Sequence, residues 1–141
     1  MDSSLNNAPK IEDLQSYVDK NLDLFSKILN SLESVSEEAK SYLVQKTSKD
    51  GRIDNTLLEM YQYEGHGFAW FETYRISLRE TLNWYKSLKD INKSSRLESG
   101  ILIFAFSEYL TQMRNGIMMS QTEVVRPSIL GISQESFSFY E

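Results

Sequence analysis

The 141-residue sequence predicts an all-α protein, either an antiparallel four-helix bundle or a pair of helical hairpins, followed by an irregular C-terminal tail. Three observations predict this fold class. Apolar residues recur every three or four positions over long stretches, two prolines and six glycines are few, and short turn signals separate the periodic stretches. We expect a disordered leader over residues 1–10, a helical bundle domain over 11–117, and a tail or connector over 118–141.

The first periodic stretch covers residues 11–35, where the apolar side chains form one stripe along a helix. A serine followed by acidic residues is typical of a helix N-terminus. We therefore predict that a second helix begins at Ser34 or Ser36 and runs to about Lys46.

The clearest turn signal is the segment 49–52, Lys-Asp-Gly-Arg. We predict a turn here and not a strand pair, because neither flank alternates with a period of two. A third helix should begin near Asp54 and extend to Asp90. We expect it to bend or break at Gly65 and Gly67, since each glycine costs about 1 kcal/mol relative to alanine.

A fourth helix is predicted from about Arg96 to Asn115. Ser94 or Ser95 is a good N-cap residue with Glu98 as its capping-box partner, and the glycine after Asn115 is a natural C-cap. Its apolar residues cover more than one stripe, which predicts a central and well-buried helix.

Large aromatic residues are concentrated in the third helix and cover more than one of its faces. They are Trp70, Phe71, Tyr74, Trp84 and Tyr85. Such a surplus can meet a partner or another domain. It can equally pack inside this bundle, and the sequence leaves both readings open.

Composition narrows the classes of function. A formal net charge of −5 disfavours binding to nucleic acid or to an anionic membrane, and favours a protein partner or a small ligand. The absence of cysteine excludes disulfides, thiolate metal sites and a cysteine nucleophile. The first residues lack the pattern of a secretory signal, and no apolar run approaches the roughly 20 residues of a membrane span. We expect a cytoplasmic protein.

His66 is the only histidine, and this limits catalytic and metal chemistry. One histidine cannot supply the two Glu-x-x-His pairs of a di-iron bundle, and zinc without cysteine usually needs two or more. A Ser-His-acid triad is formally open, but no Gly-x-Ser-x-Gly elbow is present. The glycines flanking His66 do not form a phosphate loop, and the segment 50–54 lacks the ligands of a calcium loop. We predict no catalytic, cofactor-binding or metal-binding residue. We interpret carboxylates such as Glu72 as parts of solvated helix faces, on which Glu72 pairs with Arg75, and Arg79 with Glu72 or Glu80.

The segment 118–127 mixes methionines, hydroxyls, an amide, an acid and an arginine without amphipathic periodicity. It is either a connector or a docking arm in which Arg126 pairs with an anionic group. With the third helix, it supplies our predicted partner-binding residues, which are His66, Trp70, Tyr74, Met119, Gln121, Glu123 and Arg126.

Two blocks of sequence resemble a known family. The first is Glu-Gly-His-Gly-Phe-Ala-Trp-Phe-Glu-Thr-Tyr at 64–74, continuing through Leu82. The second runs over 108–131 and includes Gly-Ile-x-Met-Ser-Gln-x-Glu-x-Val-Arg-Pro from residue 116. Together with the turn at 50–54, they resemble the helical N-terminal extension of alphaproteobacterial-type acyl-CoA dehydrogenases. The likeness covers most of residues 35–131 and departs at Met118, where the family has proline, and at Ile129, where a polar residue is usual.

The resemblance implies a non-catalytic accessory domain that aids assembly or covers the catalytic core of a flavin-dependent enzyme. It implies FAD in the resembled parent protein and assigns no flavin contact and no catalytic base to this chain. The alternative is a free-standing helical-bundle interaction module that forms a homo-oligomer through the third helix. A third reading is an enzyme centred on His66.

Overall fold

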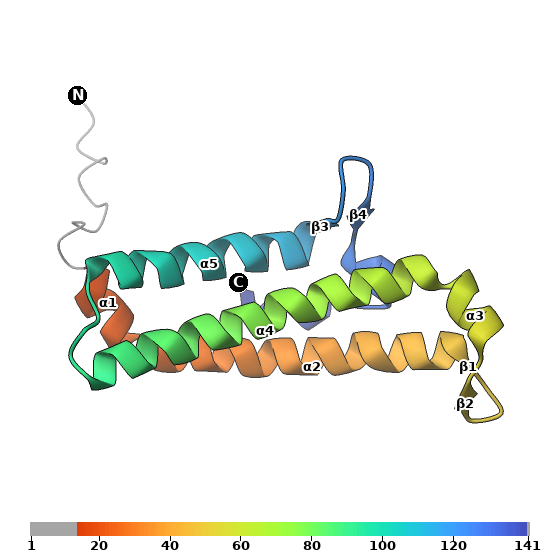
Figure 1. Cartoon of the computed structure of the whole chain (residues 1–141), viewed down its shortest axis with the longest axis horizontal. Coiled ribbons are helices and arrows are strands. Elements are labelled where there is room, and N and C mark those ends of the chain that lie inside the picture. The colour runs from red at the N-terminus through yellow and green to blue at the C-terminus, as the bar shows by residue number, and fades with distance from the viewer. Residues whose placement is uncertain (1–13, 141) are drawn as a thin grey trace.

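The computed structural model describes residues 14–140 and confirms the all-α fold with an irregular C-terminal tail. The long helices α2 (Leu22–Thr47), α4 (Gln62–Asp90) and α5 (Arg96–Asn115) lie side by side, and each runs antiparallel to the one before it (Figure 1). The short helix α1 (Leu14–Lys20) packs against α5, and α3 (Asn55–Met60) precedes α4. The predicted leader over 1–10 lies outside the described residues.

The first helical break falls at Asn21, between α1 and α2, and the predicted break at Ser34 or Ser36 is wrong. Asn21 donates from its side chain to the Tyr17 carbonyl at 2.8 Å, a bond that competes with helix continuation. Ser36 is buried inside α2 and donates to the carboxylate of Glu72. Its hydroxyl therefore serves a contact between helices, which a serine-acid pattern does not distinguish from a cap.

The turn at Asp50 and Gly51 forms as predicted, but the rejection of a strand pair is wrong. Strands β1 (Ser48–Lys49) and β2 (Arg52–Ile53) pair antiparallel across it. Both turn residues have positive φ, 53° and 75°, as this tight hairpin requires. Two residues per strand are too few to show alternation in the sequence.

Helix α4 runs unbroken through both of its early glycines, so the predicted bend or break there is wrong. The interruption lies instead at Tyr61, between α3 and α4. Gly67 is needed for packing: a Cβ at this position would lie 2.7 Å from both methyl groups of Val125, which is itself buried. The glycine thus lets the tail approach the helix closely.

Helix α5 begins with the predicted capping box, in which the side chains of Ser95 and Glu98 reciprocally bond the backbone. It ends at Gly116, whose φ is 138°. The prediction that α5 is buried on more than one stripe is wrong. Leu97 is 68% exposed and Phe104 is 71% exposed, whereas Leu102 and neighbouring core residues are fully covered.

The C-terminal segment folds back onto the helices. It contains the strands β3 (Ile117–Met118) and β4 (Val124–Val125), which pair antiparallel, and two 3₁₀ helices, η3 (Pro127–Leu130) and η4 (Glu135–Tyr140). Glu38 on α2 accepts hydrogen bonds from the Ser133 amide and the Ser136 hydroxyl. The segment adds these residues to the buried core: Ile117, Val125, Leu130, Ile132 and Phe137.

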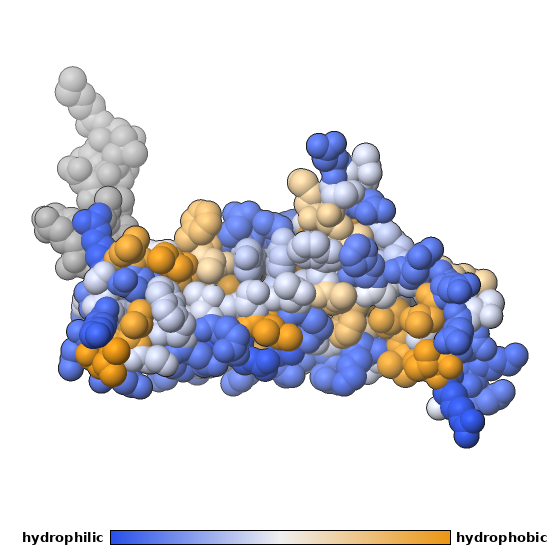
Figure 2. Space-filling model, in the orientation of Figure 1, coloured by the Kyte–Doolittle hydropathy of each residue, from blue (hydrophilic) through white to orange (hydrophobic). Residues whose placement is uncertain are grey.

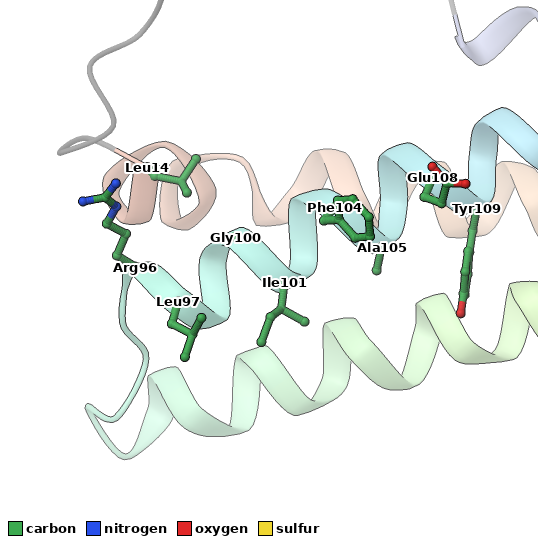
Figure 3. A pocket seen from close by; sticks show the side chains of 9 residues that line it. All are labelled: Leu14, Arg96, Leu97, Gly100, Ile101, Phe104, Ala105, Glu108 and Tyr109. Carbon is green, nitrogen blue, oxygen red and sulfur yellow. The ribbon is translucent and has the colours of Figure 1, made fainter.

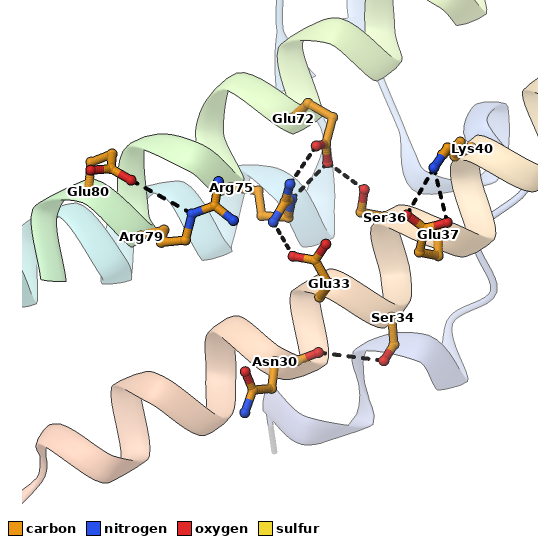
Figure 4. A network of polar contacts seen from close by, with 10 residues as sticks. All are labelled: Asn30, Glu33, Ser34, Ser36, Glu37, Lys40, Glu72, Arg75, Arg79 and Glu80. Carbon is orange, nitrogen blue, oxygen red and sulfur yellow. Dashed lines mark hydrogen bonds and ion pairs between the residues drawn. The ribbon is translucent and has the colours of Figure 1, made fainter. Parts of the chain in front are cut away.

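A charged network joins α2 to α4 (Figure 4). Arg75 on α4 is 7% exposed and bonds the predicted partner Glu72 at 2.9 and 2.7 Å, and it also contacts Glu33 on α2. Burial raises the pKa of Glu72, but the hydrogen bonds from Arg75 and Ser36 and the Arg75 charge outweigh it, so that this pKa lies below its ordinary value. Glu72 is thus a structural ion-pair partner, and its assignment to a solvated face is wrong.

Candidate functional site: an aromatic face and an apolar groove

Three of the predicted partner-binding residues share one side of α4, because they follow one another at intervals of four. His66 is exposed, and its Nε2 accepts a hydrogen bond of 3.1 Å from the indole Nε1 of Trp70. The Trp70 ring meets Tyr74 edge-on with centroids 6.2 Å apart. The histidine thus holds the tryptophan side chain in place.

The aromatic row continues from α4 onto α5. Tyr74 stacks on Tyr109 with ring centroids 4.4 Å apart and an interplanar angle of 15°, and its hydroxyl donates to Gln112 Oε1 at 2.9 Å. Burial raises the pKa of Tyr74, and the neighbouring Tyr109 and Glu108 raise it further. The Tyr74 hydroxyl is therefore a hydrogen-bond donor at neutral pH.

The β3–β4 hairpin carries the other predicted residues and stands away from the helices (Figure 1). Its base is fixed by Val125 against Gly67 and by the Tyr63 hydroxyl, which donates to the Val124 carbonyl at 3.0 Å. Its tip is closed by the amide of Met119, which donates to the carbonyl of Glu123 at 2.9 Å. The hairpin is therefore anchored at its base by these contacts and carries polar residues at its tip.

The predicted residues fall into two adjoining groups. Gly67 and Val125, which pack together, directly follow His66 and directly precede Arg126, respectively, so the α4 group and the hairpin group adjoin. Gln121, Glu123 and Arg126 are exposed. We call the joined surface of α4 and the hairpin the hairpin face.

Sequence reasoning missed two exposed apolar residues of the hairpin face. Met118 is 65% exposed and Val124 is 40% exposed, and they are cross-strand partners in β3 and β4. The predicted Met119 is instead half-buried and packs against the core. Alternation along a strand could have separated the two methionines, had the strand been recognised.

A second surface was missed altogether: an apolar groove of about 780 Å³ along the N-terminal half of α5 (Figure 3). Its lining consists of Leu14, Arg96, Leu97, Gly100, Ile101, Phe104, Ala105, Glu108 and Tyr109. Figure 2 shows hydrophobic side chains gathered over the end of α5 beside α1. The sequence does indicate this groove, because it corresponds to the second apolar stripe of α5. We had interpreted that stripe as a sign that the helix is buried.

The large aromatic residues of the third predicted helix are partly buried in the bundle and partly available to a partner, so each of the two interpretations holds for some of them. Phe71 and Tyr85 are fully buried, while Trp70 and Tyr74 are half-buried on the hairpin face. Trp84 is 39% exposed on α4. Most of this aromatic surface therefore packs within the bundle.

The described residues hold no cluster of metal-ligating side chains. Among residues 14–140, no three histidine, aspartate or glutamate side chains gather as a metal site. In the same range no helix is long and apolar enough to cross a membrane. The hairpin face and the groove present apolar and hydrogen-bonding side chains, which are suited to contact with another molecule.

By its fold and by these surfaces, the chain is an all-α domain with two exposed apolar regions. No family model matches it. It is similar to a (2S)-methylsuccinyl-CoA dehydrogenase of Cereibacter sphaeroides, with 39% identity over 111 residues, which are 79% of this chain and 20% of that protein.

The predicted resemblance is thereby confirmed: this chain is a helical domain related to a segment of an acyl-CoA dehydrogenase. It spans about a fifth of the length of that relative. A match of this extent is consistent with the predicted N-terminal extension.

Proposed function

We propose that this chain is a non-catalytic accessory domain that docks on the flavin-binding catalytic part of an acyl-CoA dehydrogenase in the cytoplasm. The observation that carries the proposal is the meeting of the two sequence blocks that resemble the family. Residues 64–82 lie on α4 and residues 108–131 span the end of α5 and the hairpin, and they join through Tyr74, Gln112, Gly67 and Val125. The exposed residues of the two blocks therefore adjoin at the hairpin face, which supports the proposal.

The chemistry of the hairpin face suits a protein partner. Met118, Val124 and the half-buried Trp70 supply apolar area on this face. Gln121 and Arg126 add exposed polar and charged side chains. Protein–protein interfaces commonly combine apolar and aromatic side chains with polar groups and arginine.

In this proposal the flavin and the catalytic base belong to the dehydrogenase part, and the accessory domain contributes binding alone. The relative carries a matching segment and four-fifths of additional chain in one polypeptide. Interfaces between domains of one chain resemble transient protein–protein interfaces, so a separate accessory domain can dock on a catalytic part through a surface of modest size. The hairpin face is the surface through which we expect this docking.

The test is a titration of the full chain against the flavoprotein part of the Cereibacter sphaeroides relative, from which the matching segment has been deleted. We expect saturable binding by biolayer interferometry. The double variant Met118→Asp, Arg126→Glu should weaken it at least about tenfold, because it places a charge in the apolar centre and reverses one on the rim.

Phe104→Asp is the matched control, since it introduces the same charge at an exposed apolar position in the groove, outside the hairpin face. It should leave the affinity within about twofold. Failure of the wild-type chain to bind, or an equal loss in the control, would overturn the proposal.

A further inference from the structure

We propose that two copies of this chain pair through the groove on α5, with their α5 helices antiparallel. The two-fold axis crosses the groove at the height of Leu102 along the helix. The groove adjoins the hairpin face where Tyr109 stacks on Tyr74, but it presents other residues to a different partner, so the inference goes beyond the proposed function. The occupant of each groove is the α5 helix of the second copy.

The groove presents apolar area that the described part of the chain leaves uncovered. Leu97 is 68% exposed, Ile101 44% and Phe104 71%, and they follow one another on one face of the helix. Leu14 of α1 forms one wall (Figure 3). A contiguous apolar patch with charged ends is typical of an interaction site.

The charges at the ends of the groove are complementary to each other. Arg96 lies at one end and Glu108 at the other (Figure 3). They are six residues before and six residues after Leu102. A two-fold axis at Leu102 therefore brings Arg96 of each copy beside Glu108 of the other copy, about 18 Å apart along one helix at 1.5 Å per residue.

The same axis also matches shape. Gly100 and Phe104 are two residues before and two residues after Leu102. A Cβ at Gly100 would meet only Leu14, at 3.8 Å, so the surface above this glycine is open. Antiparallel pairing sets Phe104 of one copy over Gly100 of the other, where the missing side chain leaves room for the ring.

Self-complementarity of this kind is what a two-fold interface requires, because one patch must serve as both partners. Charge and shape select the same axis independently, Arg96 with Glu108 and Gly100 with Phe104. This agreement favours a second copy over an unrelated partner. Helix rows four residues apart, such as 96–100–104–108, are also the rows that interdigitate when two helices pack closely.

The test is the mass of the full chain in solution, by size-exclusion chromatography with light scattering and by sedimentation equilibrium. We expect a shift from the 16.4 kDa monomer to a species of twice that mass as the concentration rises from about 1 to about 100 µM. Phe104→Asp should weaken the dimer at least about 100-fold by placing a charge at the centre of the interface.

A charge exchange tests the register. Arg96→Glu and Glu108→Arg should each weaken the dimer, since each sets like charges opposite one another, and the double variant should restore it. Met60→Asp is the matched control at a residue of similar exposure, 67%, on α3, and should leave the dimer intact. None of these measurements includes a dehydrogenase, so their outcome is independent of the proposed function.

Three results would overturn the pairing. The first is a wild-type chain that stays monomeric at the highest concentration, and the second is a double charge variant that fails to recover the dimer. The third is a wild-type chain that stays monomeric while a variant lacking residues 1–13 dimerises. That result would make residues 1–13 of the same chain the occupant of the groove.

Discussion

Two phenylalanines on α5, only two residues apart, lie in opposite environments. Phe106 is 3% exposed and meets Phe25 of α2 edge-on, with ring centroids 4.8 Å apart. Phe104 is 71% exposed and lines the groove. The same side chain on the same helix thus belongs to the core in one case and to a free surface in the other.

The difference shows that burial depends on what the rest of the chain supplies opposite each stripe. The stripe of Phe106, Leu110 and Met113 is buried where α4 and the returning tail pack against α5, and Phe25 of α2 meets Phe106. Among residues 14–140, the stripe of Leu97 and Phe104 has only Leu14 of α1 at its edge. A helix with two apolar stripes therefore indicates two contacts and does not say whether both lie within one chain.

The largest effect should come from truncating the two phenylalanines. Phe106→Ala removes a buried ring and should destabilise the fold by about 3–5 kcal/mol, whereas Phe104→Ala at an exposed site should change the stability of the monomer by no more than about 0.5 kcal/mol. Urea denaturation followed by circular dichroism, at a concentration low enough to keep the chain monomeric, measures both. Equal losses would show that the groove is covered within the chain.

A similar contrast separates the two early glycines of α4. A Cβ added at Gly65 would have no neighbour within 4 Å, whereas a Cβ added at Gly67 would collide with Val125 at 2.7 Å. Gly65→Ala should therefore stabilise the protein by up to about 1 kcal/mol through helix propensity. Gly67→Ala should destabilise it by about 1–3 kcal/mol, because Val125 is buried and its branched side chain is stiff.

Thermal melts of the two variants give the sign directly. If Gly67→Ala proved as stabilising as Gly65→Ala, the base of the hairpin would have to yield easily, and the hairpin face could not be rigid. Binding to the dehydrogenase part should then be insensitive to this position. The pair of alanine variants thus links the packing of the hairpin to its proposed role.

The sequence was sufficient for features that depend on local chemistry. The Asp50-Gly51 turn, the Asp54 start of α3 and the Ser95–Glu98 capping box all follow from bonds within a few residues. The fold class follows from periodicity. The pairing of Glu72 with Arg75 was also predictable, because residues three apart are neighbours on a helix.

Features that depend on contacts between distant segments were missed. Ser36 was interpreted as a cap because its partner Glu72 lies on another helix. Gly67 was interpreted as a break because Val125 lies 58 positions later in the sequence, and the tail that carries it has no periodic pattern. The groove was missed because an apolar stripe in the sequence does not indicate whether another element of the chain covers it.

The smallest predicted effect is the contribution of a carboxylate charge to stability. It contrasts the partly covered carboxylate of Glu72 with the more exposed carboxylate of Glu33. The Glu72 side chain is 22% exposed, against 52% for Glu33, and both bond Arg75. Because the pKa of Glu72 is lower in the folded protein than in the unfolded chain, its carboxylate contributes stability above the unfolded pKa. That contribution is lost as the pH falls through the folded pKa.

We therefore expect Glu72→Gln to cost about 1 kcal/mol at pH 7, less than the roughly 1.5–3 kcal/mol of hydrogen bonds to a charged group, because the glutamine amide can still accept a hydrogen bond. The cost should shrink as the pH falls from the ordinary pKa of a glutamate, where the unfolded chain takes up its proton, to the lower pKa of the folded protein, where the Glu72 carboxyl also becomes neutral. Urea denaturation at a series of pH values between neutral and acid measures the difference between the two proteins. A difference that stays constant with pH would mean that Glu72 acts through packing alone, and Arg75 would then take its electrostatic stabilisation from Glu33.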